Sequence, residues 1–241
     1  AVMQLVERGK VDLDEPLSRY LPELAGSALD VHEPTVRQVL THHAGLPGNY
    51  MEGFELEKPV PEAFRRLPRV AAGLPPACAP DTVFAYSNEG YALLGSLVER
   101  AGGMPYGEAV TRGILEPLGM SRTRFLLAEE DRRQSVMGFD GRKQRAIYPI
   151  RDLPAGALMA SAADMERFMR FMFDGGGHGV LGEAAFAEMT RRQNAGVALD
   201  GTVIAIDKAA NESAYGISGV LASQILEGKI TSVPPAAQEF T

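Results

Sequence analysis

The sequence predicts a mainly helical protein, and three observations lead to this prediction. Capping residues precede segments whose apolar side chains recur at helical spacing, and glycines follow those segments. Only one short segment has extended character. No internal repeat, heptad run or low-complexity tract interrupts the pattern. With 241 residues, 45% of them hydrophobic, the chain can form one large domain or two small ones.

The first expected elements are helices and a turn. Residues 1–9 have the pattern of an amphipathic helix that ends at a glycine. Residues 14–21 begin with an acid and an early proline, which predicts a short helix. A capping-box pattern at 35–38 opens the next helix, and a turn at 42–48 follows it.

The middle of the chain alternates between irregular and strongly helical segments. Residues 47–83 hold seven of the 16 prolines, so we expect little regular structure there beyond a short helix at 62–66. Ser87 then caps a long helix over 88–101, which a pair of glycines ends.

The later elements include the most regular helix of the chain. We expect a helix over 106–115 and a short extended segment over 122–127. Ser161 caps a helix over 162–173 that glycines close. One face of that helix carries an apolar stripe, which at this spacing predicts a core position rather than a partner groove. The stripe consists of Met165, Phe168, Met169, Met172 and Phe173.

Charge and composition exclude several classes of partner. The net charge of -7 is spread along the sequence, so nucleic acid is not an expected partner. No run of about 18 apolar residues predicts a membrane span. A single cysteine, Cys78, excludes an internal disulfide framework and a cysteine-rich metal site. No feature predicts a cofactor or an oligomeric state.

Two acidic or histidine-rich stretches have a structural explanation. His42 and His43 are adjacent, point in different directions and lack Cys or HExxH-type partners, so we expect them to hold the turn rather than a metal. Asp12, Asp14 and Glu15 resemble the start of a calcium loop without its glycine and final glutamate, and a capped turn explains them.

Several stretches together resemble one family, the serine β-lactamase-like hydrolases, which include class C β-lactamases, D-alanyl-D-alanine carboxypeptidases and related esterases. Residues 1–16 resemble the helix that follows the catalytic Ser-x-x-Lys of this family. Residues 40–47 resemble its Leu-Thr-His-x-Ser-Gly-Leu-Pro segment, with Ala44 in place of the usual serine. Residues 84–91 resemble its Tyr-x-Asn motif, and 154–165 a later turn and helix start. Order and spacing agree, so the resemblance covers roughly the first 200 residues.

The resemblance implies a fold, an activity and two site residues. The family fold is α+β: it places an antiparallel sheet flanked by helices beside a helical subdomain, and we expect this chain to lack part of that sheet. We expect residues 1–202 to form part of that domain, mainly its helical portion, and leave 203–241 as an uncertain C-terminal segment. By resemblance Tyr86 is the catalytic base and proton shuttle, and Asn88 binds the substrate, which is a small molecule or peptide: an ester, a β-lactam or a D-amino-acid peptide. A periplasmic or secreted location is also implied.

Acyl transfer needs a nucleophile, a base, a cation and oxyanion donors, and the sequence supplies these only in part. A tyrosine with a pKa near 10 needs a neighbouring ammonium group, which the family takes from the lysine of Ser-x-x-Lys. No serine here has lysine three positions later, and the Lys/His-Thr/Ser-Gly motif is missing beyond residue 200. We therefore expect an incomplete chain that cannot form an acyl-enzyme by itself.

Three other interpretations remain open from the sequence. Tyr86 and Asn88 could be a half-buried aromatic and a helix-start residue with no catalytic role. The chain could be a non-catalytic member of the family that binds a peptide or a partner. An α/β-type hydrolase using Ser218 is a poor fit, because Ser218 lacks the last glycine of G-x-S-x-G and no histidine follows His178.

Overall fold

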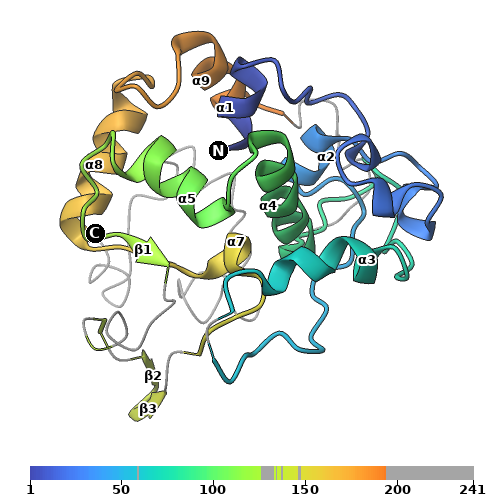
Figure 1. Cartoon of the computed structure of the whole chain (residues 1–241), viewed down its shortest axis with the longest axis horizontal. Coiled ribbons are helices and arrows are strands. Elements are labelled where there is room, and N and C mark those ends of the chain that lie inside the picture. Colours follow the sequence, from blue (N-terminus) through green and yellow to red (C-terminus); the bar gives the residue numbers. More distant parts are fainter. Residues whose placement is uncertain (59, 126–132, 134, 137, 146–147, 194–241) are drawn as a thin grey trace, which may run out of the picture. The chain divides into compact units, whose positions relative to one another are not determined.

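The computed structural model describes residues 1–193 except 59, 126–132, 134, 137 and 146–147 (Figure 1). The chain divides into two compact units, residues 1–197 and 198–241, and all described residues belong to the first. The expected C-terminal segment, 203–241, and Ser218 within it lie outside the described residues.

Helices form most of the described structure. The α-helices are α1 (Val2–Glu7), α2 (Val36–Leu40), α3 (Leu67–Ala71), α4 (Asn88–Gly102), α5 (Tyr106–Val110), α7 (Leu153–Gly156), α8 (Ala162–Phe173) and α9 (Glu183–Thr190). Short 3-10 helices span Leu17–Arg19, Pro22–Leu24, Ala28–Asp30 and Ala63–Arg66, and a π-helical turn, Thr111–Leu115, continues α5.

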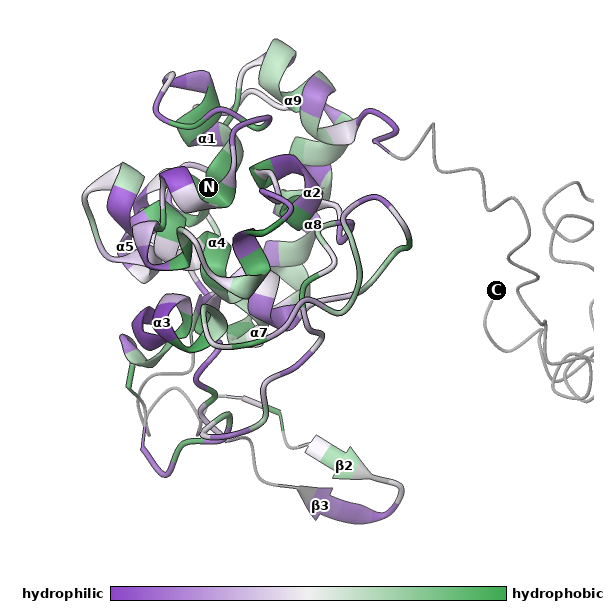
Figure 2. Cartoon of the chain, turned by 90° about the vertical axis from the view of Figure 1, so that its right-hand side faces the viewer, coloured by the Kyte–Doolittle hydropathy of each residue, from purple (hydrophilic) through white to green (hydrophobic). Residues whose placement is uncertain are grey.

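The described strands form two small antiparallel pairs. Strand β1 (Arg124–Phe125) pairs with β4 (Leu158–Met159), with Phe125 opposite Leu158. Strands β2 (Gly138–Asp140) and β3 (Lys143–Arg145) form a hairpin at the edge of the helices, where β3 is strongly hydrophilic (Figure 2). Among the described residues, no helix combines the length and apolar composition that crossing a bilayer requires.

Helix α4 is the centre of the core, and its sequence explains its ends. The Ser87 side chain accepts the backbone N–H of Gly90 and starts the helix, while Gly103 ends it with a φ of +73°. Ala92, Leu93 and Leu97 along it are completely buried. Helices α1, α2, α3, α5 and α7 all pack against α4, so the residues at its N-terminus begin a helix that is anchored in the core.

The caps predicted at Thr35, Ser87 and Ser161 are confirmed, whereas the helix expected over 14–21 is only the 3-10 turn Leu17–Arg19, which has no side-chain cap. Several other elements appear where the sequence did not predict them. Both halves of the capping box at Thr35 and Gln38 are formed, and Ser161 caps α8. The helix expected near 62–66 continues into α3, because Pro68 lies in the first turn, where its missing N–H has no partner to lose. Helices α7 and α9 and the β2–β3 hairpin were not predicted.

The prediction that the α8 stripe packs in the core is wrong for three of its five members. Met165 and Met169 are each 43% exposed and Phe173 is 81% exposed. The buried row of α8 runs instead through Asp164 and Phe171. Asp164 sets this rotation, because its carboxylate accepts hydrogen bonds from the backbone N–H of Arg122 and the Thr123 hydroxyl, at 2.7 and 2.9 Å. A buried carboxylate must keep such donors, so they fix the helix face that turns inward.

Candidate active site

Tyr86 and Asn88 lie on either side of the residue that caps α4. The Ser87 hydroxyl accepts the Gly90 N–H at 2.9 Å and donates to the carbonyl oxygen of Pro47 at 2.5 Å. Ser87 is therefore tied both to the helix that it starts and to the preceding turn. Because the capping residue is fixed and buried, the backbone that carries its two neighbours is fixed with it.

The turn at residues 41–49 holds this same segment through backbone hydrogen bonds. The N–H of Ala85 donates to the His42 carbonyl at 2.8 Å, and the N–H of Asn88 donates to the Gly48 carbonyl at 2.9 Å. Between these two bonds, the N–H of Ser87 donates to His42 Nδ1 at 3.2 Å. Residues 85–88 are thus bonded to the turn at three points, where the chain enters the first residue of α4.

His42 and His43 hold the turn, as the sequence predicted. His42 adopts a left-handed conformation, with a φ of +60°, that reverses the chain, and the His43 Nδ1–H donates to the Thr41 carbonyl at 2.7 Å. Among the described residues, no group of three or more His, Cys, Asp or Glu side chains could hold a metal ion.

The His42 ring also lies between two tyrosines. Its centroid is 4.5 Å from that of Tyr86 and 4.9 Å from that of Tyr91. Burial lowers the pKa of His42, and the charge of neighbouring His43 lowers it further. The ring is accordingly neutral at neutral pH. Since its Nδ1 must accept the Ser87 N–H, its proton is on Nε2.

The two tyrosines beside His42 have opposite environments. The Tyr91 hydroxyl donates to the Leu40 carbonyl at 3.0 Å, and burial raises the pKa of Tyr91. Tyr86 is 57% exposed, although its ring rests on His42. Tyr91 therefore serves the packing, whereas Tyr86 presents a phenol at the surface on a rigid backbone.

Asn88 is oriented by Asn49, the residue at which the turn continues into the loop 49–56. Its Nδ2 donates to the Asn49 side-chain oxygen at 2.6 Å. Loop residues 49–56 in turn contact the start of α7 through Arg151, which bonds the carbonyls of Tyr50 and Glu52 at 2.7 Å each. Sequence reasoning missed Arg151 together with the buried acids Glu89 and Asp152. The signal was a charged Arg-Asp pair directly before the apolar stretch at 153–160.

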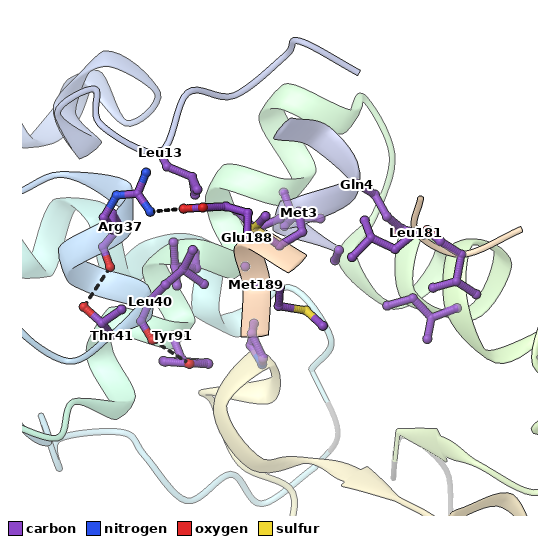
Figure 3. Close-up of a pocket in the computed structure, with 18 of the residues that line it drawn as sticks. Met3, Gln4, Leu13, Arg37, Leu40, Thr41, Tyr91, Leu181, Glu188 and Met189 are labelled. Carbon is purple, nitrogen blue, oxygen red and sulfur yellow. Dashed lines mark hydrogen bonds and ion pairs between the residues drawn. The ribbon is translucent and has the colours of Figure 1, made fainter. Parts of the chain in front are cut away.

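A cavity of about 430 Å³ opens elsewhere in the same unit (Figure 3). Its walls come from α1, α2, α4, α8 and α9 and are mainly apolar, for example Leu40, Leu94 and Leu181. Arg37 closes one end, where it forms ion pairs with Asp14 and Glu188. Neither Tyr86 nor Asn88 lines this cavity, so the candidate site is the surface at the N-terminus of α4.

Comparison with known proteins places the chain among proteins of the β-lactamase and penicillin-binding type. The Beta-lactamase family model matches residues 1–206, and the chain belongs to this family. Penicillin-binding protein 4 of Amycolatopsis lactamdurans is 32% identical over 208 residues, which are 81% of this chain and 54% of that protein. Esterase EstB of Burkholderia gladioli is 36% identical over 152 residues, covering 55% and 36%.

Solved structures confirm the predicted fold class. The octameric penicillin-binding protein homologue from Pyrococcus abyssi is 27% identical with a TM-score of 0.62, over 79% of this chain and 45% of that one. A class C β-lactamase is 25% identical with a TM-score of 0.61, over 76% and 49%. The chain thus spans about half the length, or less, of these relatives.

Proposed function

We propose that this chain carries the tyrosine–asparagine side of an acyl-transfer site, in which Tyr86 transfers protons and Asn88 binds the substrate. The observation that supports this proposal is the exposed phenol of Tyr86 on a backbone bonded to the turn at three points. Tyr91, whose hydroxyl serves the packing, is instead half-buried and donates to the Leu40 carbonyl. The relatives' names, penicillin-binding protein, esterase and β-lactamase, favour an ester, a β-lactam or a D-amino-acid peptide as the substrate.

Asn88 has the chemistry for binding a substrate carbonyl. A side-chain amide carries two N–H groups, so Asn88 can keep its bond to Asn49 while its second N–H binds the substrate. A donor fixed before the substrate arrives needs no reorganisation during the reaction, which is the condition for effective electrostatic catalysis.

Tyr86 requires a cation that His42 does not supply. The neutral His42 ring cannot stabilise a phenolate by charge at neutral pH. No serine in the 241 residues has lysine three positions later, so neither the nucleophile nor its lysine comes from such a motif in this sequence. We therefore propose that the chain alone forms no acyl-enzyme. Mass spectrometry after incubation with a fluorescent penicillin and a p-nitrophenyl ester should show no adduct, and a stoichiometric adduct would contradict this.

The role of Tyr86 is tested in a chimera with penicillin-binding protein 4 of Amycolatopsis lactamdurans. The matched segment of that protein is replaced by the corresponding segment of this chain, which includes residues 86–88 because the match covers 81% of the chain. In a chimera that reacts with fluorescent penicillin, Tyr86→Phe should slow acylation by about 10²–10⁴-fold, the usual contribution of a general acid–base group.

The control is another exposed tyrosine. Tyr148 is 54% exposed, and Tyr148→Phe should leave the acylation rate unchanged. Equal rates for Tyr86→Phe and the unmodified chimera would instead favour the non-catalytic, peptide- or partner-binding alternative.

A further inference from the structure

Three buried charged side chains form a cluster next to the residues that orient Asn88. Glu89, the next residue of α4, is 3% exposed, and Arg151 and Asp152 before α7 are buried as well. Arg151 Nε donates to Asp152 Oδ1 at 2.6 Å and its Nη2 donates to Oδ2 at 3.1 Å. The same Nη2 is 3.5 Å from Glu89 Oε1. The guanidinium therefore joins an acid from α4 to an acid from the segment leading into α7.

This cluster also anchors the loop that orients Asn88. Arg151 donates to the carbonyls of Tyr50 and Glu52, and its guanidinium carbon lies 5.3 Å from the centre of the Tyr50 ring. The Tyr50 N–H donates to Glu89 Oε1. Tyr50 follows Asn49, whose side chain accepts the hydrogen bond from the Asn88 amide. Asn88 is therefore connected to the charged cluster through its hydrogen bond to Asn49 and the hydrogen bond of the next residue, Tyr50, to Glu89.

The cluster contains one more acid than it has bases. Two carboxylates share a single guanidinium, and burying an uncompensated negative charge is costly. Glu89 Oε2 is fully buried, and as a carboxylate oxygen it accepts no hydrogen bond from the described residues. A proton on Glu89 removes both problems, because the resulting O–H can donate to a neighbouring carboxylate. Burial, and then the negative charge of Asp152, raise the pKa of Glu89 to about 7.

We infer that Glu89, Arg151 and Asp152 are positioning residues for Asn88, with Glu89 held as a neutral acid that donates its proton in a hydrogen bond to Asp152. In this form the cluster has one negative and one positive charge, and every Arg151 contact to the loop is kept. The inference rests on the proposed function only in taking Asn88 as the substrate-binding group.

Loss of the Glu89 proton to solvent changes the cluster in a defined way. A second buried negative charge then competes for Arg151, and the hydrogen bond to Asp152 is lost. The other titratable group on the loop side is the Tyr50 hydroxyl, which donates to Glu52 at 2.6 Å. Because Tyr50 bonds Glu89 through its N–H and follows Asn49, the Asn49–Asn88 hydrogen bond responds to the protonation of Glu89.

The test is an NMR pH titration of the full chain. The ¹³C resonance of the Glu89 carboxyl, assigned with Glu89→Gln, should titrate with a midpoint near pH 7. The two N–H resonances of the Asn88 side-chain amide should shift with the same midpoint. In Glu89→Gln, which keeps a neutral donor, the Asn88 amide should remain at its low-pH position throughout. The matched control is Glu99→Gln in the same helix, where Glu99 pairs with Arg65 instead.

A second variant separates this account from general loosening of the fold. Asp152→Asn removes the negative charge that raises the Glu89 pKa, so the Glu89 midpoint should fall by about one pH unit, a tenfold loss of proton affinity. A Glu89 midpoint in the ordinary range near 4.5, or an Asn88 amide that does not follow it, would overturn the inference. The titration needs no turnover, so it can fail while the Tyr86 result in the chimera stands, and the reverse also holds.

Discussion

The two longest helices, α4 and α8, begin in the same way and end up in different surroundings. In each, a serine hydroxyl accepts a hydrogen bond from the backbone N–H three residues later: Ser87 from Gly90, and Ser161 from Asp164. Around Ser87 the turn at 41–49 encloses the start of the helix, whereas α8 leaves Met165, Met169 and Phe173 at the surface.

A cap and an apolar spacing therefore specify a helix without specifying which of its faces is covered. The covered face depends on partners distant in sequence, such as Pro47 for Ser87 and Thr123 for Asp164. Candidate site residues lie at the enclosed helix start, where such distant partners hold the backbone most firmly.

The largest expected effect is the loss of Arg151 from the enclosed region. Arg151→Met leaves two buried acids with no cation, and removing one partner of a buried charge pair typically lowers the free energy of unfolding by about 3–5 kcal/mol. Urea denaturation measures this change. Arg170→Met on α8 is the control, because Arg170 pairs with Glu166 at the surface and its loss should leave stability nearly unchanged. Equal effects would remove the distinction between the two regions.

A pH effect of somewhat smaller size should come from Glu89. Its pKa is about 7 in the folded chain against an ordinary value of 4.5, so folding favours the protonated form. The contribution of Glu89 to the free energy of unfolding is fully present below pH 4.5 and is lost as the pH rises through 7. The loss is up to about 3 kcal/mol, at roughly 1.4 kcal/mol per pKa unit.

Urea denaturation at a series of pH values from 4.5 to 8 measures this loss. The effect of Glu89 is the difference between the wild type and Glu89→Gln, because the lowered pKa values of His42 and of the Ala1 amino group act in both proteins. Glu188 does not interfere, because Arg191 and Arg37 lower its pKa to about 2 and its effect lies below pH 4.5. Stability profiles of the wild type and Glu89→Gln that run parallel across pH 4.5–8 would contradict the raised pKa.

The two caps give a direct comparison of intermediate size. Ser161→Ala should lower the free energy of unfolding by about 1 kcal/mol, the usual value of a lost N-cap. Ser87→Ala should cost about 2 kcal/mol, because it also leaves the Pro47 carbonyl without its donor. Thermal or urea unfolding of both variants tests the difference, and a Ser161→Ala effect equal to or larger than that of Ser87→Ala would show that the turn contributes nothing to the cap.

The smallest effect should come from the exposed face of α8. Met169→Gln should change the free energy of unfolding by less than about 0.5 kcal/mol, whereas Phe171→Ala in the same helix should lower it by about 3–5 kcal/mol. Urea denaturation of the two variants decides whether the buried row has been assigned correctly. A large loss for Met169→Gln would restore the predicted apolar stripe as a core element.

Local signals explain how much of this fold the sequence could predict. Ser87, Thr35 and Ser161 act on neighbours within three residues, and the helices they start were predicted with their caps. Helix α9 lacks a side-chain cap, and α3 starts beside a proline, so neither had such a signal. The rotation of α8 could not be predicted, because Asp164 bonds residues about 40 positions away.

The same distinction between local and distant contacts explains which residues of the candidate site were predicted. Tyr86 and Asn88 were found because their motif is contiguous in the sequence. The contribution of His42 to Tyr86 was missed, since its ring and Nδ1 contact residues more than 40 positions later. Glu89 and Arg151 were missed for the same reason, being 62 residues apart.

We propose that the Tyr86 hydroxyl serves the reaction and not the fold, and a comparison with Tyr91 tests this proposal. Both rings contact His42, but of the two hydroxyls only that of Tyr91 bonds a carbonyl, that of Leu40, within the described part of the chain. In urea denaturation, Tyr91→Phe should lower the free energy of unfolding by about 1 kcal/mol, and Tyr86→Phe should leave it within about 0.5 kcal/mol of the wild type. A loss of 1 kcal/mol or more for Tyr86→Phe would show that its hydroxyl is a structural group and would contradict the proposed role.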